Sequence, residues 1–241
     1  MWSAVAPLAA SAAVLSAAAG APGSPITYSG SQATLAAAAT FDTQGTDLTV
    51  TLTNTSAADV LVPADVLTAV FFQVSGATLL LTPTSAVVPP TSSVLFGAAG
   101  PGGNVGGEWA YRGDLTGAPG GLTYGISSAG FGHFGPQDRF PGANLHGPES
   151  PGGLEYGILS AGDNPATGNT PVTGSQPLIR NEVVFRLGGL PAGFDPSTRI
   201  SAVTFQYGTD TGSEPSFPGI PAPGTMALAF AAGACCMRRR R

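Results

Sequence analysis

Apolar and polar residues alternate along several short stretches of the chain, which is the pattern of half-buried β-strands. The clearest stretch is Asp47–Asn54, where leucine and valine alternate strictly with polar side chains. Further strands are expected at Val66–Val74, Thr78–Leu81, Val94–Phe96, Glu182–Leu187 and Ile200–Tyr207, with the last two as a pair.

Glycine, proline, asparagine, aspartate and serine separate these runs, as turn residues do. The alanine run Ala36–Ala39 favours a helix locally, but Leu35 and Phe41 on either side make it equally readable as a strand. Many short strands with little helix favour an all-β fold, either a β-sandwich or a jelly roll. A short apolar helix is expected at the C-terminus.

The middle of the chain contains an internal repeat. Gly121–Gly130 recurs as Gly153–Gly162, with eight of ten residues identical at a spacing of 32 residues. We expect the two copies to form equivalent strands of one sheet, each with a tyrosine and an isoleucine. A loop rich in glycine and proline, residues 131–152, separates them, and loops of this length are typically functional or disordered.

Both ends of the chain indicate export. Trp2–Ala21 is apolar or small almost throughout, which is typical of a secretory signal peptide, and cleavage is expected between Ala19 and Gly20. At the other end, Pro221-Ala222-Pro223-Gly224 precedes an apolar segment of 13 residues, Thr225–Met237. Four arginines follow, Arg238, Arg239, Arg240 and Arg241, and charge clustered after an apolar segment marks the cytoplasmic side of a membrane.

This C-terminal pattern resembles a PEP-CTERM sorting domain, with Pro-Ala-Pro where the family has Pro-Glu-Pro. The resemblance implies cutting near the motif by the membrane-embedded protease exosortase. It divides the chain into a signal peptide (1–19), an exported domain (20–217) and a sorting signal (218–241). The exported part is similar to XDD-type exosortase-dependent surface proteins at Leu48–Thr55, Val62–Leu67, Gly107–Tyr111, Gly125–Gly130 and Gly147–Leu154.

Charge excludes one class of partner for the exported part. Without the two signals it has five arginines, no lysine and fourteen carboxylates, a net charge of −9. Nucleic-acid binding needs basic groups to neutralise phosphates, so we expect none. Both cysteines, Cys235 and Cys236, lie in the tail, and the exported domain therefore contains no disulfide.

Catalytic patterns are sparse. His133 and His146 share the long loop with Asp138, Arg139 and Glu149, but their spacing matches no zinc site. We expect no cofactor, no metal and no enzymatic activity. If the protein binds a ligand, the candidate contacts are aromatic residues that could stack on sugar rings: Trp109, Tyr111, Tyr124, Phe134 and Tyr156.

The two terminal segments thus predict a protein exported by the Sec translocon, cut by signal peptidase and inserted transiently in the inner membrane. The resemblance to PEP-CTERM proteins implies processing by exosortase. The protein would act at the cell surface or outside the cell as a structural or adhesive component of an exopolysaccharide matrix or biofilm. A carbohydrate-binding module is the alternative hypothesis, and a secreted hydrolase, with Glu108 among its candidate carboxylates, is the third.

Overall fold

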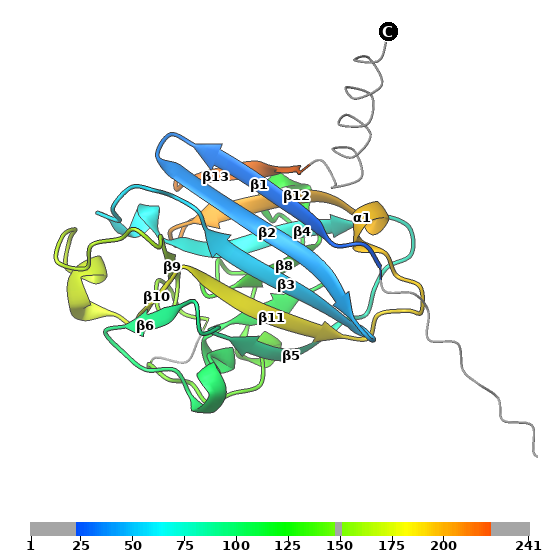
Figure 1. Ribbon diagram of the computed structural model, residues 1–241, viewed down its shortest axis with the longest axis horizontal. Helices are drawn as coiled ribbons and strands as arrows, with labels where there is room; N and C mark the ends of the chain where they lie inside the picture. Colours follow the sequence, from blue (N-terminus) through cyan, green and yellow to red (C-terminus); the bar gives the residue numbers. More distant parts are fainter. Residues whose placement is uncertain (1–22, 148–150, 223–241) are drawn as a thin grey trace, which may run out of the picture.

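The structure, a computed structural model, describes residues 23–147 and 151–222 and is mostly β (Figure 1). The expected signal cleavage at Ala19 and Gly20, the motif residues Pro223 and Gly224, the C-terminal helix and Arg238–Arg241 lie outside the described residues. The strands are β1 (Ile26–Gln32), β2 (Leu35–Gln44), β3 (Asp47–Asn54), β4 (Leu67–Val74), β5 (Thr82–Val87), β6 (Ser93–Leu95), β7 (Ala110–Arg112), β8 (Tyr124–Ser127), β9 (Ile158–Leu159), β10 (Leu178–Arg180), β11 (Glu182–Gly188), β12 (Ile200–Tyr207) and β13 (Ser216–Pro221). The helical turns are η1 (Pro63–Asp65), η2 (Pro101–Gly103), η3 (Gly106–Glu108), η4 (Pro119–Gly121), η5 (Pro136–Asp138), η6 (Pro171–Ser175) and α1 (Pro196–Arg199).

These strands form one large mixed sheet that curls into a half-barrel (Figure 1). Its order is β5-β11-β3-β2-β1-β13-β12-β4-β9-β10-β6, and β8 and then β7 are attached beside β4. The pair β9–β10 is parallel and the other strand pairs are antiparallel. The expectation of a β-rich fold with little helix is therefore confirmed.

The alternation seen in the sequence sets which face of each strand is buried. In β3, Leu48, Val50 and Leu52 are fully buried and the threonines between them are partly exposed. The alanine run belongs to β2, in which Leu35, Ala37, Ala39 and Phe41 face inward. Pairing with β1 and β3 on either side thus resolves the ambiguity of that run in favour of strand.

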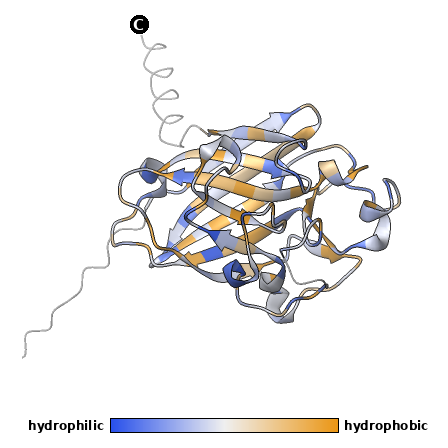
Figure 2. Ribbon diagram, turned by 180° about the vertical axis from the view of Figure 1, so that it is seen from behind, coloured by the Kyte–Doolittle hydropathy of each residue, from blue (hydrophilic) through white to orange (hydrophobic). Residues whose placement is uncertain are grey.

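The curled sheet has two halves, β5-β11-β3-β2-β1 and β12-β4-β9-β10-β6, with β13 between them. Aromatic rings fill the space between these halves. Phe41 of β2 meets Phe72 of β4 edge to face at 5.2 Å between ring centroids, and Phe72 stacks on Tyr124 of β8 at 5.4 Å. Figure 2 shows apolar residues gathered along the strands. The two halves therefore share one apolar interior.

A buried asparagine also ties the halves together. The side-chain amide of Asn54, at the end of β3, donates to the carbonyl of Ile158 in β9 at 2.9 Å. Its Oδ1 accepts the backbone N–H of Ser56 at 3.1 Å. Because Asn54 is 1% exposed, these bonds replace the water it gives up on folding.

Two predictions about strands are wrong. Glu182–Leu187 and Ile200–Tyr207 do not pair with each other, because β11 lies between β3 and β5 whereas β12 lies between β13 and β4. Residues 78–81 form no strand, although Leu79 and Leu81 are buried and Leu80 is 87% exposed. The Leu79 N–H donates to the hydroxyl of Tyr124 at 2.9 Å, so its backbone is satisfied outside the sheet.

The repeat does produce two strands of one sheet. The first copy supplies β8, in which Ile126 faces Val70 of β4, and the second supplies β9, in which Ile158 faces Leu67 of the same strand. The copies are not equivalent in backbone, since Tyr124 lies inside β8 whereas Tyr156 precedes β9 with a positive φ of 56°.

Candidate functional site

The five aromatic residues expected to contact a ligand belong to the protein interior. Their exposed fractions are 0% for Trp109, 5% for Tyr111, 2% for Tyr124, 7% for Phe134 and 1% for Tyr156. Trp109 packs on Phe185 with 4.9 Å between ring centroids, and the Tyr156 hydroxyl donates to the carbonyl of Ala98 at 2.9 Å. Stacking on a sugar needs an open ring face, so their burial argues against that prediction.

The long loop is fastened to the domain by a buried carboxylate. Glu108, in η3, is 0% exposed, and its Oε1 accepts the backbone N–H groups of Leu145 at 2.5 Å and His146 at 2.9 Å. The N–H of Phe140 donates to the carbonyl of Trp109 at 2.9 Å. Glu108, which the hydrolase hypothesis uses as a candidate acid, therefore has a structural task in holding residues 140–146.

The two histidines of this loop lie in different surroundings. The carbonyl of His133 accepts a bond from the guanidinium of Arg112 at 3.1 Å, whereas Nδ1 of His146 lies 3.9 Å from a carboxylate oxygen of Glu155. Among the described residues no group of three or more histidines, cysteines, aspartates and glutamates could hold a metal ion.

A pair of carboxylates beside β9 has opposite pKa shifts. Asp163 is 7% exposed, its Oδ1 accepts the N–H of Val60 at 3.1 Å, and burial raises its pKa. Asp59 accepts bonds from the hydroxyl of Thr167 and from the N–H of Asn164, and these bonds lower its pKa. Asp163 is thus the carboxylate whose charge opposes folding.

We expect Asp163→Asn to raise stability more at pH 7 than at pH 4. The pKa of Asp163 is higher in the folded state than in the unfolded state, so the charged carboxylate destabilises the fold above the folded-state pKa. This destabilisation disappears as the pH falls towards the unfolded-state pKa of about 4. Urea unfolding of both proteins at the two pH values measures the difference between them.

The opposite sign is expected for the control Asp114→Asn, because the guanidinium of Arg112 lowers the pKa of Asp114. The Asp114 carboxylate then contributes stability that is lost at low pH, and the contribution is small because the pair is exposed. A stability gain for Asp163→Asn that is equal at both pH values, or larger at pH 4, would contradict the assignment.

The predicted processing motif begins inside a strand. β13 ends at Pro221, and the N–H of the next residue, Ala222, donates to the carbonyl of Thr27 on β1 at 2.8 Å. The boundary between exported domain and sorting signal, predicted after residue 217, therefore runs through β13. A hollow of about 640 Å³ lies beside this strand, between Ser29–Ser31 of β1 and Phe217–Pro218.

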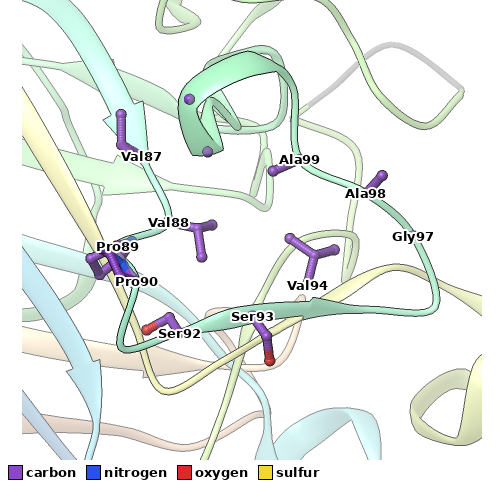
Figure 3. A pocket seen from close by; sticks show the side chains of 12 residues that line it. Val87, Val88, Pro89, Pro90, Ser92, Ser93, Val94, Gly97, Ala98 and Ala99 are labelled. Carbon is purple, nitrogen blue, oxygen red and sulfur yellow. The ribbon is translucent and has the colours of Figure 1, made fainter.

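A second hollow is apolar (Figure 3). It has a volume of about 490 Å³ and lies between the end of β5, strand β6 and η2. Val88, Val94 and Ala99 point into it. The described residues that line it are uncharged, so it offers apolar surface and main-chain groups to a ligand.

A third hollow, of about 320 Å³, is polar. Arg112 and Asp114 line it, with Nε of the guanidinium donating to Oδ1 of the carboxylate at 2.5 Å. Gln137, Asp138 and Tyr111 also line it. Amide, carboxylate and guanidinium groups side by side can bind hydroxyl-rich molecules through hydrogen bonds.

Comparisons with known proteins give no match, whether with protein-family models, with curated proteins or with solved structures. Across residues 23–147 and 151–222, no helix has both the length and the apolar character needed to cross a membrane.

Proposed function

We propose that this chain is an exported protein of the cell surface or extracellular matrix, with a structural or adhesive role in exopolysaccharide or biofilm. In this proposal the Sec translocon and signal peptidase act on the N-terminal segment. Exosortase acts at the C-terminal motif after transient insertion in the inner membrane. The proposal includes no nucleic-acid partner, since the exported part has a net charge of −9.

The observation that carries the proposal is the position of the motif on the folded domain. Ile220, Pro221 and Ala222 are exposed at the end of β13, and Ile220 is 70% exposed. The described domain therefore ends at its surface. In the sequence, residues 223–241 follow, with the apolar segment and the four arginines. This arrangement suits a folded cargo with a removable C-terminal signal.

The facing halves of the curled sheet support a sandwich as the finer description of the fold. Contacts such as Phe41 with Phe72 connect the two halves across the interior, and β13 joins them along one side. We propose that the domain is a sandwich closed at β13. The jelly-roll alternative remains a prediction about strand connectivity.

The intact mass of the native protein, recovered from the surface and medium of its host, tests the proposal. We expect a mature form that lacks the N-terminal segment and Arg238–Arg241. A mature form that keeps the arginines and stays in the inner membrane would contradict exosortase processing.

The polar hollow favours a second candidate function, a carbohydrate-binding module. Its side chains suit sugar hydroxyls, although the buried aromatic rings do not supply a stacking surface. Polysaccharide pull-down should then weaken in Gln137→Ala and not in Gln32→Ala, because both glutamines are exposed but only Gln137 lines the hollow. Equal binding by the two variants would contradict this function. That the protein is not an enzyme stays a prediction.

A further inference from the structure

We propose that the cut that releases the C-terminal tail falls after Ala222, so that the mature domain keeps all of β13. The inference rests on the proposed function in one respect, namely that the tail is removed. The position of the cut along the chain is inferred from the pairing of β13 with its neighbouring strands.

β13 joins the two halves of the curled sheet. Its first part pairs with β12, from Ser216 opposite Gln206 to Gly219 opposite Val203. Its last part pairs with β1, where Ile220 faces Ser29 and Pro221 faces Tyr28. No other strand connects β1 to β12 along the described sheet. Removing residues from 218 onward would take away every pair between β13 and β1.

The prolines determine where each pairing ends. Backbone N–H groups point alternately to the two sides of a strand. The N–H of Ala222 points to β1, as its bond to Thr27 shows, so even-numbered residues of β13 face β1 and odd-numbered residues face β12. Pro218 therefore lacks the donor towards β1, and Pro221 lacks the donor towards β12.

This alternation matches the observed ladders. The pairing with β1 starts only after Pro218, at Ile220, and the pairing with β12 stops at Gly219, before Pro221. β13 thus changes partner at its centre, and each proline lies where a missing donor costs no ladder bond. The strand therefore belongs to the folded domain up to Ala222.

Side-chain packing anchors the same strand. Phe217 is 5% exposed, and its ring lies 5.9 Å from Phe205 and 5.7 Å from Tyr207 between centroids. The backbones also approach closely, because a Cβ on Gly219 would come within 3.1 Å of the Cβ of Tyr28. Removing β13 would expose these rings and the N–H and C=O groups of two neighbouring strands.

A protease must bind its substrate with the backbone freed from other partners. Within residues 216–222 the backbone is engaged with β12 or β1, so cutting there requires local opening of the joint between the halves. Ala222 makes the last bond of this set, to Thr27. A cut that leaves β13 paired with both neighbours therefore falls on the C-terminal side of Ala222.

Sequencing the C-terminus of the mature protein from the host tests the position. We expect a terminus at Ala222 or at a later residue before Arg238. A terminus at residue 221 or earlier would overturn this inference and leave exosortase-type processing standing. A terminus at Arg241 would overturn both.

Two shortened chains test the physical basis without any processing enzyme. Both keep the natural N-terminal segment and are exported; one ends at Ala222 and the other at Phe217. The chain ending at Ala222 should unfold at the same urea midpoint as the mature protein. The chain ending at Phe217 should have a lower midpoint and be degraded faster by a broad-specificity protease. Equal midpoints and equal proteolysis for the two chains would overturn the inference.

Discussion

The Trp109→Ala variant is expected to lose about 3–5 kcal/mol of the free energy of unfolding. Trp109 is 0% exposed and packs on Phe185, which in turn contacts Phe140 at 5.4 Å between ring centroids. Truncation removes the largest side chain of this group, and the surrounding sheet can only partly close the cavity. Urea unfolding followed by circular dichroism measures the loss.

Leu80→Ala is the matched control for this substitution. It also shortens a large apolar side chain, but Leu80 is 87% exposed, so a change within about 0.5 kcal/mol is expected. If Trp109→Ala were as stable as the control, the placement of Trp109 in the core would be contradicted.

The expected loss of stability makes Trp109→Ala unsuitable for testing carbohydrate binding. A pull-down with Trp109→Ala cannot separate loss of a ligand contact from loss of the fold, because the same ring supports the core. Surface side chains such as Gln137 avoid the problem, since truncating them removes little packing.

The Gly107→Ala variant is expected to lose about 3 kcal/mol, at the upper end for overpacking. The backbone of η3 packs directly against the backbone of residues 141–144. A Cβ on Gly107 would overlap the carbonyl of Ala143. The overlapping atoms belong to backbone, so no side-chain rotation can relieve the clash. The bonds from Leu145 and His146 to Glu108 would be strained or lost as the loop moves away. Thermal and urea unfolding measure the loss.

Gly147→Ala provides the comparison within the same loop. A Cβ on Gly147 meets nothing within 4 Å, and the expected change is within about 0.5 kcal/mol. Equal stability of the two variants would show that residues 141–146 do not lie against η3 in solution.

Local patterns in the sequence were sufficient for the class of fold and for several strands. The alternation in Asp47–Asn54 predicts β3 because side chains of a strand point alternately to its two faces, and this holds whatever the partners are. The apolar run Thr78–Leu81 predicts a strand that does not form, although Leu79 and Leu81 are buried. A strand needs a neighbour, and the neighbour there is the hydroxyl of Tyr124.

Candidate ligand contacts were harder to predict. Trp109, Tyr111, Tyr124, Phe134 and Tyr156 are rings among glycines, which suits either a binding surface or a core. The sequence alone does not distinguish a binding surface from a core, because the burial of a ring depends on which segments fold over it. The polar hollow was missed for a related reason: Tyr111–Asp114 and Gln137–Asp138 are far apart in the chain and meet only in the fold.

By itself the sequence determined the β-rich class, the inward face of strands such as β3 and the composition of the exported part, since these depend on residue type and near neighbours. The tertiary structure decided the strand partners, the burial of the aromatic rings and the extent of the domain at its C-terminal end. Pro218 and Pro221 illustrate the difference. Each proline removes one donor wherever it stands, but only the positions of β1 and β12 determine whether a ladder bond is lost with it.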